Sequence, residues 1–376
     1  MNRIVLIGNG FDLAHGLKTS YNDFINWYWG KRVDELGSNQ TRVSEDSLCK
    51  LSIRKDSGIR CWSLLFACNP DFIENRDKSN YSALIPTILK YPETFDYEPS
   101  SLLETIMQSV EEKGWVDIEN DYYQLIKSHI KGDDFRFTIK ELNEQMEFLK
   151  SKLAEYLSEI NPEERNDDIH KDMISHFNIA DISTEGRQKA EESIGLKPVY
   201  CNGLTFNPDD TDKHFPERIM LLSFNYTSTA RLYENYNIQY NYIHGELKEP
   251  KNIIFGYGDE LDKQYQDILD RNDNELLRNV KSVKYLETRR YREMLEFLQS
   301  AAFQVFIMGH SCGNSDRTLL NTIFEHENCV SIKPFFHKWE DGTDNYLNIV
   351  QNISRNFTDM KLFRDRVVNK EQCLTI

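Results

Sequence analysis

Six short apolar runs, several of them separated by helical patterns, constrain the fold more than any other feature of this sequence. One covers residues 3–7, and the others cover 218–226, 238–245, 251–258, 302–309 and 329–336. Amphipathic patterns at 281–300, 316–326 and 343–356 predict helices among the later runs. Strands that alternate with helices are typical of an α/β protein with a largely parallel sheet. We therefore predict a Rossmann-like, mostly parallel sheet.

The first run has no potential partner strand near it, so it must join the sheet formed by the later runs. A helix is predicted from residue 11 to about 29, and the polar stretch from Gly30 to Arg60 has no clear period and is expected to be loop or peripheral structure. Residues 61–215 are mainly helical in pattern, with the clearest apolar stripe in "FTIKELNEQMEFLKSKLAEYLSEI". The prediction is a nucleotide-binding domain made of residues 1–29 and 216–376, interrupted by a helical insertion at 30–215.

Charge and composition limit the classes of partner. The 376 residues include 45 basic and 61 acidic side chains, a formal charge of -16 that disfavours nucleic acid as a partner. No apolar run approaches the roughly 18 residues of a membrane span, and residues 1–13 lack the pattern of a signal peptide. We expect a cytoplasmic protein without a membrane partner, and a homo-oligomer is left open. Seven cysteines form no C-x-x-C pair and are expected to be mostly small buried apolar residues.

The stretch "IVLIGNGFDLAHG" joins the first strand to a helix through a glycine loop. Gly8 and Gly10 allow a tight turn and the close approach of a phosphate, and the helix start offers free N–H groups. Leu13 stands where a dehydrogenase loop has its third glycine, and the spacing does not fit a Walker A loop. A nucleotide loop that includes Asn9 and Phe11 and a plain strand-to-helix turn both remain open.

Polar residues follow three further predicted strands. Asn225 follows 218–224, His244 ends the next run, and the loop "GHSCGNSD" follows 302–308. That loop contains Gly309, His310, Ser311, Asn314 and Asp316. Each residue alone could have only a structural role, but parallel strands bring such positions to one carboxyl edge, where open α/β sheets bind ligands.

Four motifs of this sequence resemble those of the AbiH family, bacterial proteins associated with abortive infection by phage. They are "IVLIGNGFDLAHGLKTSYNDF", "LLSFNYTSTARLYE", "YIHGELKEPKNIIFGYGDE" and "FIMGHSCGNSDRTLLNTIFEH", and "WVDIENDYYQLI" at 115–126 is a less specific match. The resemblance covers both ends of the chain. It implies a phage-defence effector, with a phage component as a possible trigger.

The same motifs are more remotely similar to those of sirtuin-like NAD-binding proteins. That resemblance implies that Gly8, Asn9, Gly10 and Phe11 hold the pyrophosphate, that Asn225 lies near the nicotinamide ribose and that His244 is the catalytic histidine. It matches Gly309 and Ser311 to the loop near the adenosine ribose, and His310, Asn314 and Asp316 of the same loop are further candidates to bind the nucleotide. Asp12 and Thr227 replace a serine and an aspartate of the sirtuin pattern, and the zinc-binding cysteines of sirtuin deacylases have no counterpart. Protein deacylation is therefore not expected, and no metal is expected.

Cleavage of the nicotinamide–ribose bond builds positive charge on the sugar and needs an activated oxygen nucleophile. A neutral imidazole such as His244 suits proton abstraction, and the amide of Asn225 suits positioning. A carboxylate stabilises an oxocarbenium-like state, and Asp12 is our candidate. The leading hypothesis is an NAD hydrolase, with the small-molecule nucleotide NAD as substrate.

Two alternatives remain open at this stage. The first is a metal-dependent nuclease or nucleotide hydrolase that uses an acidic cluster with His244, and Arg289, Arg290 and Arg292 could then dock a backbone. The acidic candidates of this cluster are Asp12, Asp117, Glu119 and Asp259. Beside Asp12, the carboxylates that could stabilise the oxocarbenium-like state are Asp117, Glu119, Asp259 and Glu260. The second is a non-catalytic module that binds NAD or ADP-ribose and reports its level, which the threonine at position 227 supports.

Overall fold

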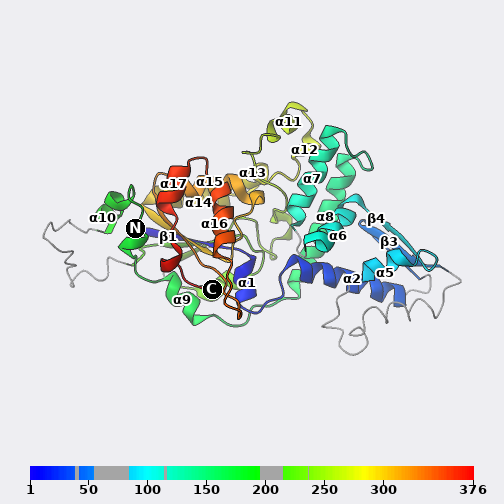
Figure 1. Ribbon diagram of the computed structural model, residues 1–376, viewed down its shortest axis with the longest axis horizontal. Coiled ribbons are helices and arrows are strands. Elements are labelled where there is room, and N and C mark those ends of the chain that lie inside the picture. Colours follow the sequence, from blue (N-terminus) through cyan, green and yellow to red (C-terminus); the bar gives the residue numbers. More distant parts are fainter. Residues whose placement is uncertain (39–41, 55–83, 114–116, 195–214, 236) are drawn as a thin grey trace. The chain divides into compact units, whose positions relative to one another are not determined.

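The computed structural model describes residues 1–38, 42–54, 84–113, 117–194, 215–235 and 237–376 (Figure 1). The chain forms two compact units. We call the first the sheet unit, and it comprises Met1–Lys18, Ile160–Asp267 and Asn279–Ile376. The second, called the helical unit, comprises Thr19–Glu159 and Ile268–Arg278. The sequence predicted that the insertion covers residues 30–215. In the structure, residues 160–194 belong instead to the sheet unit.

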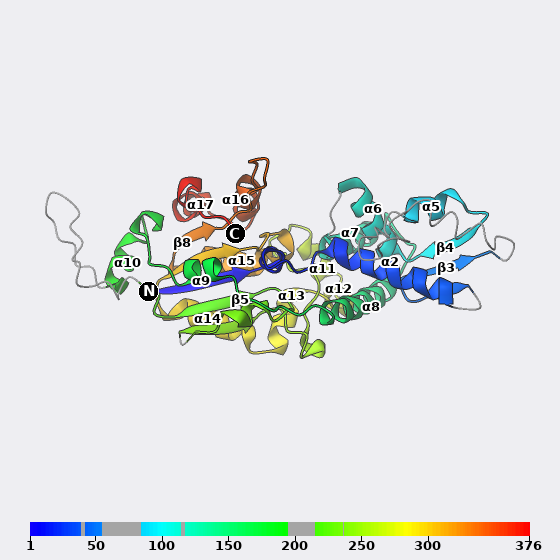
Figure 2. The same ribbon diagram turned by 90° about the horizontal axis from the view of Figure 1, so that it is seen from below.

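The sheet unit contains five parallel strands in the order β6-β5-β1-β7-β8. Their bounds are β1 Asn2–Ile7, β5 Ile219–Ser223, β6 Ile238–Tyr242, β7 Phe303–Met308 and β8 Cys329–Pro334. Figure 2 shows the blue N-terminal strand β1 beside the green β5. Numbered along the chain within this sheet, the order is 3-2-1-4-5, the first five positions of the doubly wound Rossmann arrangement. The predicted α/β class and parallel sheet are confirmed.

Both faces of the sheet are covered, which explains why β1, β5, β7 and β8 are buried along their whole length. Ile4 and Leu6 of β1 face a core that includes residues of α14, α15 and α16. Val5 and Ile7 face the opposite core, which contains Phe11 of α1 and residues of α9. The helices are α1 Asn9–Ala14, α9 Asp167–Met173, α10 Arg187–Ile194, α13 Lys281–Lys284, α14 Arg290–Ser300, α15 Arg317–Phe324, α16 Tyr346–Arg355 and α17 Met360–Arg366, and α11 Tyr265–Asp270 spans the junction of the units. Short 3-10 turns are η4 Ile179–Asp181, η6 Thr229–Tyr233, η7 Pro250–Asn252, η8 Tyr285–Glu287, η9 Asn314–Asp316 and η10 Lys370–Gln372.

The predicted strand at 251–258 is wrong. Residues Pro250–Asn252 form a 3-10 turn, and Tyr257 makes only an isolated parallel bridge with Val280. The reason lies in the glycines of "FGYG". A Cβ atom at Gly256 would lie 1.9 Å from the carbonyl oxygen of Asn279. This segment therefore pairs with the backbone at 279–281 and not with a strand of the sheet.

Two predicted helices are interrupted. The helix expected from 11 to 29 ends at Ala14, since Gly16 adopts a left-handed φ of 73°, and α2 starts at Tyr21. Two reciprocal hydrogen bonds cap the start of α2. The backbone N–H of Ser20 donates to the carboxylate of Asp23, and the backbone N–H of Asp23 donates to the hydroxyl of Ser20. The helix expected at 281–300 is divided into α13, η8 and α14, because Thr288 is extended.

The helical unit combines helices with a small antiparallel sheet of order β2-β3-β4. Its elements are α2 Tyr21–Ser38, β2 Val43–Glu45, β3 Cys49–Ile53, α5 Leu84–Lys90, β4 Phe95–Pro99, α6 Ser101–Lys113, α7 Ile118–Lys131, α8 Ile139–Ser158 and α12 Asn274–Leu277. The prediction of loop from Gly30 onward is wrong for α2, which continues to Ser38, and for β2 and β3. Apolar and polar residues alternate in "CKLSI", and this pattern, which predicts a strand, matches the alternating burial of β3.

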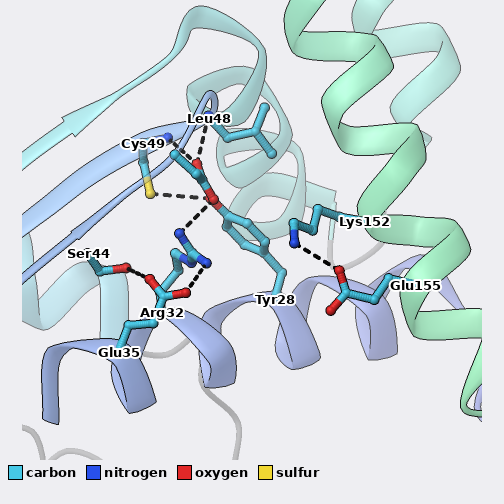
Figure 3. A network of polar contacts seen from close by, with 9 residues as sticks. Tyr28, Arg32, Glu35, Ser44, Leu48, Cys49, Lys152 and Glu155 are labelled. Atoms are coloured by element: carbon cyan, nitrogen blue, oxygen red, sulfur yellow. Dashed lines mark hydrogen bonds and ion pairs between the residues drawn. The ribbon is translucent and has the colours of Figure 1, made fainter. Parts of the chain in front are cut away.

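A buried carboxylate anchors α2 to the turn between β2 and β3 (Figure 3). The hydroxyl of Tyr28 and the guanidinium of Arg32 both donate to Asp46, at 3.1 and 2.8 Å. The backbone N–H groups of Leu48 and Cys49 donate to the same carboxylate, at 2.8 and 3.0 Å. Because Arg32 and Asp46 are largely shielded from water, this pair makes α2 and the hairpin one packed element.

The described cysteines support the expectation of buried apolar residues. Cys49, Cys312 and Cys329 are buried and Cys373 is half-buried, and all four are free thiols. The other three cysteines, Cys61, Cys68 and Cys201, lie outside the described residues.

Candidate functional site

The strand order brings most of the predicted site residues to one edge of the sheet. The loops after β1, β5, β6 and β7 begin at the carboxyl ends of neighbouring parallel strands. After β1 the chain continues to β5 on one side of the sheet, and after β7 it continues to β8 on the other. The order therefore switches direction between β1 and β7, and doubly wound folds bind nucleotides at such a switch point. Gly8–Asp12, Asn225, His244 and the 309–316 loop therefore belong to one region.

The glycines of the first loop serve a close contact between two loops. The N–H of Gly10 donates to the carbonyl of Gly309 at 2.8 Å. A Cβ at Gly8 would lie 2.5 Å from the Cα of His310, and a Cβ at Gly309 would lie 2.0 Å from the backbone nitrogen of Phe11. The N–H of Phe11 is bonded to the Gly8 carbonyl, so two of the N–H groups expected to bind phosphate already have partners inside the protein.

Asp12 is a buried carboxylate directly after this loop, with 1% of its surface exposed. The hydroxyl of Thr227 donates to Oδ2 at 2.7 Å, and the hydroxyl of Thr229 donates to Thr227 at 3.2 Å. Oδ1 accepts no hydrogen bond from the described part of the chain. Burial raises the pKa of Asp12, although Thr227, Thr229 and Asn225 oppose the shift. Thr227, which stands where the sirtuin-like pattern has an aspartate, is thus a hydrogen-bond donor to Asp12.

Asn225 connects the loops that follow β5 and β1. Its side-chain nitrogen donates to the carbonyl of Gly8 at 2.9 Å, and its backbone N–H bonds to the hydroxyl of Ser223. The residue is half-buried at the carboxyl end of β5. Its amide therefore holds the glycine loop beside β5, a structural task that exists independently of any ligand.

His244 lies in a buried charged cluster, which we define as His244, Lys281, His310 and Asp316. The Nζ atom of Lys281 and the Nε2 atom of His244 lie 2.8 and 3.2 Å from Oδ1 of Asp316. Nε2 of His310 lies 3.5 Å from Oδ2. Burial, with the charge of Lys281 nearby, lowers the pKa of His244 to about 4. The imidazole of His244 is therefore neutral at pH 7, as a proton acceptor requires.

The rest of the 309–316 loop divides into anchored and exposed parts. Asn352 donates to the carbonyl of Ser311 at 2.8 Å, and Asn356 donates to the carbonyl of Cys312 at 2.9 Å. The side chains of Ser311 and Asn314 are exposed, as is Asn9 of the first loop. Whether these three bind a nucleotide stays a prediction. Asp316 differs from them because it is buried and paired with the ammonium group of Lys281.

The acidic residues of the metal-dependent alternative have other roles in their own units. In the sheet unit, Asp259 pairs with Arg317 at 3.4 Å, and Glu260, a candidate for the oxocarbenium-like state only, is exposed. In the helical unit, Asp117 caps α7 by accepting the N–H of Asn120 at 3.1 Å. Glu119 is buried in the first turn of α7. Over the described ranges, no three His, Cys, Asp or Glu residues are grouped so as to hold a metal ion. Arg290 of the basic stripe pairs with Glu249 at 3.0 Å.

Sequence reasoning missed Lys281 and Tyr285. Lys281 is fully buried, and the hydroxyl of Tyr285 lies 3.2 Å from Nε2 of His244. Lys281 and Tyr285 are four residues apart in the sequence, a spacing that places both side chains on one side of a helix. Nothing in "NVKSVKY" distinguishes a lysine that pairs with a carboxylate 35 positions later from a solvated one.

Fold and site together define a doubly wound α/β protein with a buried charged cluster and a buried carboxylate at the carboxyl edge of its sheet. The profile of the family described as bacteriophage abortive infection AbiH matches residues 4–338, and the chain belongs to this family. No curated protein and no solved structure was found to match. The similarity to sirtuin-like proteins thus stays a prediction. No described helix combines the length and apolar character needed to cross a membrane.

Proposed function

We propose that this phage-defence protein hydrolyses NAD at the carboxyl edge of its sheet and so depletes the nucleotide in an infected cell. The observation that carries the proposal is the placement of Asp12, Asn225 and His244 after three adjacent strands of a sheet in Rossmann order. The exposed side chains of Asn9 and Ser311 belong to the same edge. Membership of a family associated with abortive infection supports the biological setting.

The reaction would proceed by displacement at C1′ of the nicotinamide ribose. The bond between C1′ and the nicotinamide nitrogen breaks, a water oxygen bonds to C1′, and the water proton passes to His244. Nicotinamide and ADP-ribose are the products. The neutral imidazole of His244 supplies the base, and the carboxylate of Asp12 opposes the positive charge that develops on the sugar. Asn225 fixes the glycine loop that lines this edge.

Purified protein is expected to release nicotinamide from NAD, and both His244→Ala and Asn225→Ala are expected to reduce the rate. General-base catalysis contributes typically about 10²- to 10⁴-fold, so His244→Ala should fall within that range. The measurement is nicotinamide release by chromatography, with and without phage lysate, on variants whose circular dichroism matches the native protein. His170→Ala is the matched control, because His170 lies in α9, outside the proposed site. Equal turnover in the native protein and both site variants would refute the assignment.

Asp12→Asn is expected to separate stability from activity. A raised pKa in the folded state means that ionisation of Asp12 destabilises the fold. This loss begins as the pH rises through the unfolded-state pKa and is complete above the folded-state pKa. Asparagine cannot ionise and still accepts from Thr227, so at pH 7 the variant should melt at the same temperature or higher. It should also release little nicotinamide, because the charge opposing the oxocarbenium is gone. Lower stability at pH 7 with full turnover would contradict both expectations.

The same assays distinguish the two alternatives. Loss of turnover on addition of a chelator would favour a metal-dependent hydrolase. Saturable binding of NAD or ADP-ribose without release of nicotinamide would favour a sensor module. That outcome would be consistent with Thr227 donating a hydrogen bond to Asp12.

A further inference from the structure

Asp316 accepts a hydrogen bond from Lys281 and faces the Nε2 atoms of two histidines, and this arrangement determines where the proton of His244 resides. Lys281 donates to Oδ1. For His310, the backbone N–H of Cys312 donates to Nδ1 at 3.0 Å, so Nε2 must carry the ring proton and faces Oδ2 of Asp316. His244 approaches Oδ1 through its own Nε2, at 3.2 Å. Two of the three partners therefore present hydrogens to this carboxylate whatever the state of His244.

Asp316 can only accept, because it is ionised. Burial alone would raise its pKa, but Lys281 and His244 hold the pKa of Asp316 well below its usual value. An ionised carboxylate has no hydrogen to donate. A lone pair on Nε2 of His244 would face the lone pairs of Oδ1, whereas an N–H at that position forms a charge-assisted bond. Because His244 is neutral, a proton on Nε2 leaves Nδ1 unprotonated.

Tyr285 is the only described competitor for this nitrogen. Its hydroxyl lies 3.2 Å from Nε2, and the two rings are nearly parallel, at 11°. If Tyr285 donated to Nε2, the proton of His244 would have to move to Nδ1, and the contact with Asp316 would become repulsive. A hydrogen bond to a charged group is worth about twice one between neutral groups, so the bond to Asp316 should dominate.

We propose that Asp316 is a positioning residue that holds His244 as the tautomer protonated on Nε2, so that Nδ1 is the nitrogen that accepts a proton from water or a ribose hydroxyl. No described residue forms a hydrogen bond with Nδ1, which leaves it available. The catalytic use of Nδ1 rests on the proposed function, whereas the tautomer is a property of the folded protein alone. The expectation from the sequence that Asp316 binds the nucleotide stays a prediction.

The test is nitrogen NMR of the full-length protein labelled with ¹⁵N-histidine, at pH 7 and without nucleotide. The chain has nine histidines, and the ring signals of His244 are assigned by their absence from the His244→Gln spectrum. Couplings between the ring nitrogens and carbon-bound protons show which nitrogen is protonated. Tyr285→Phe is measured in parallel, since it removes the competing hydroxyl and preserves the ring.

We expect one tautomer in the native protein, protonated on Nε2, and the same tautomer in Tyr285→Phe. Protonation on Nδ1 in the native protein, or a mixture of both forms, would overturn the proposal. A change of tautomer in Tyr285→Phe would also overturn it, because Tyr285 and not Asp316 would then orient the ring. Absence of NAD turnover would refute the proposed function without changing these spectra, so the two failures are distinguishable.

Discussion

Replacement of Asp316 by asparagine is expected to lower the free energy of unfolding of the sheet unit by about 3 to 5 kcal/mol, the usual cost of removing one member of a buried ion pair. Lys281 is 0% exposed and would keep its charge in the interior after losing this carboxylate. Asparagine cannot compensate. Two of the neighbours, Lys281 and His310, donate to opposite oxygens, and an amide has only one oxygen to offer them.

The measurement is urea unfolding, with hydrogen exchange of peptides from β1 and β7 to locate the loss in the sheet unit. Asp168→Asn is the matched control, since Asp168 pairs with Lys171 at 2.9 Å but both side chains are largely exposed. Exposed pairs contribute little, about 0 to 1 kcal/mol, so this variant should resemble the native protein. If both variants unfolded at the same urea concentration, the buried charged cluster would not be a source of stability.

Gly309→Ala is expected to have an effect of similar size for a different reason. A φ of 74° costs an alanine about 1 to 2 kcal/mol. The added Cβ would also lie 2.0 Å from the backbone nitrogen of Phe11, and this contact can be relieved only by separating the two loops. Overpacking costs typically about 1 to 3 kcal/mol more. The total, about 2 to 5 kcal/mol, should appear as a lower urea midpoint and faster hydrogen exchange in residues 8–12.

Gly16→Ala measures the cost of the left-handed backbone conformation without the steric contact that Gly309→Ala introduces. Gly16 has nearly the same φ, 73°, and no atom lies within 4 Å of the position that its Cβ would occupy. Its substitution should cost only about 1 to 2 kcal/mol, the conformational part alone. Equal losses in Gly16→Ala and Gly309→Ala would show that the contact between the two glycine loops is looser than the distances indicate.

The parallel sheet could be predicted because burial on both faces leaves a direct pattern in the sequence. The runs that became β1, β5, β7 and β8 are mostly apolar and buried at every strand position, whereas β6 is half-buried at its first three residues. The run at 251–258 has the same composition and lies outside the sheet. Apolar composition records burial but not the partner, and here the partner is the backbone at Asn279.

The members of the candidate site were easier to predict than their roles. Asp12, Asn225 and His244 follow strands, so their common edge could be predicted from topology. Asp316 was predicted to bind the nucleotide because it stands in a loop rich in small polar residues. Its surroundings include Lys281, which comes from a segment with no recognisable motif. Electrostatic partners far apart in the sequence leave no local signal, and the tautomer of His244 depends on them.

The central position of β1 also determines when the candidate site can form during synthesis of the chain. Arg3 pairs with Ile219 on one side and Gln304 on the other, and Gly10 meets Gly309 at the candidate site. At about 5 to 20 residues per second, the ribosome needs on the order of ten seconds or more to proceed from the first strand to its nearest partner. The N-terminal strand must wait unpaired for that time. A chain that ends before β5 and β7 therefore cannot bring these loops together.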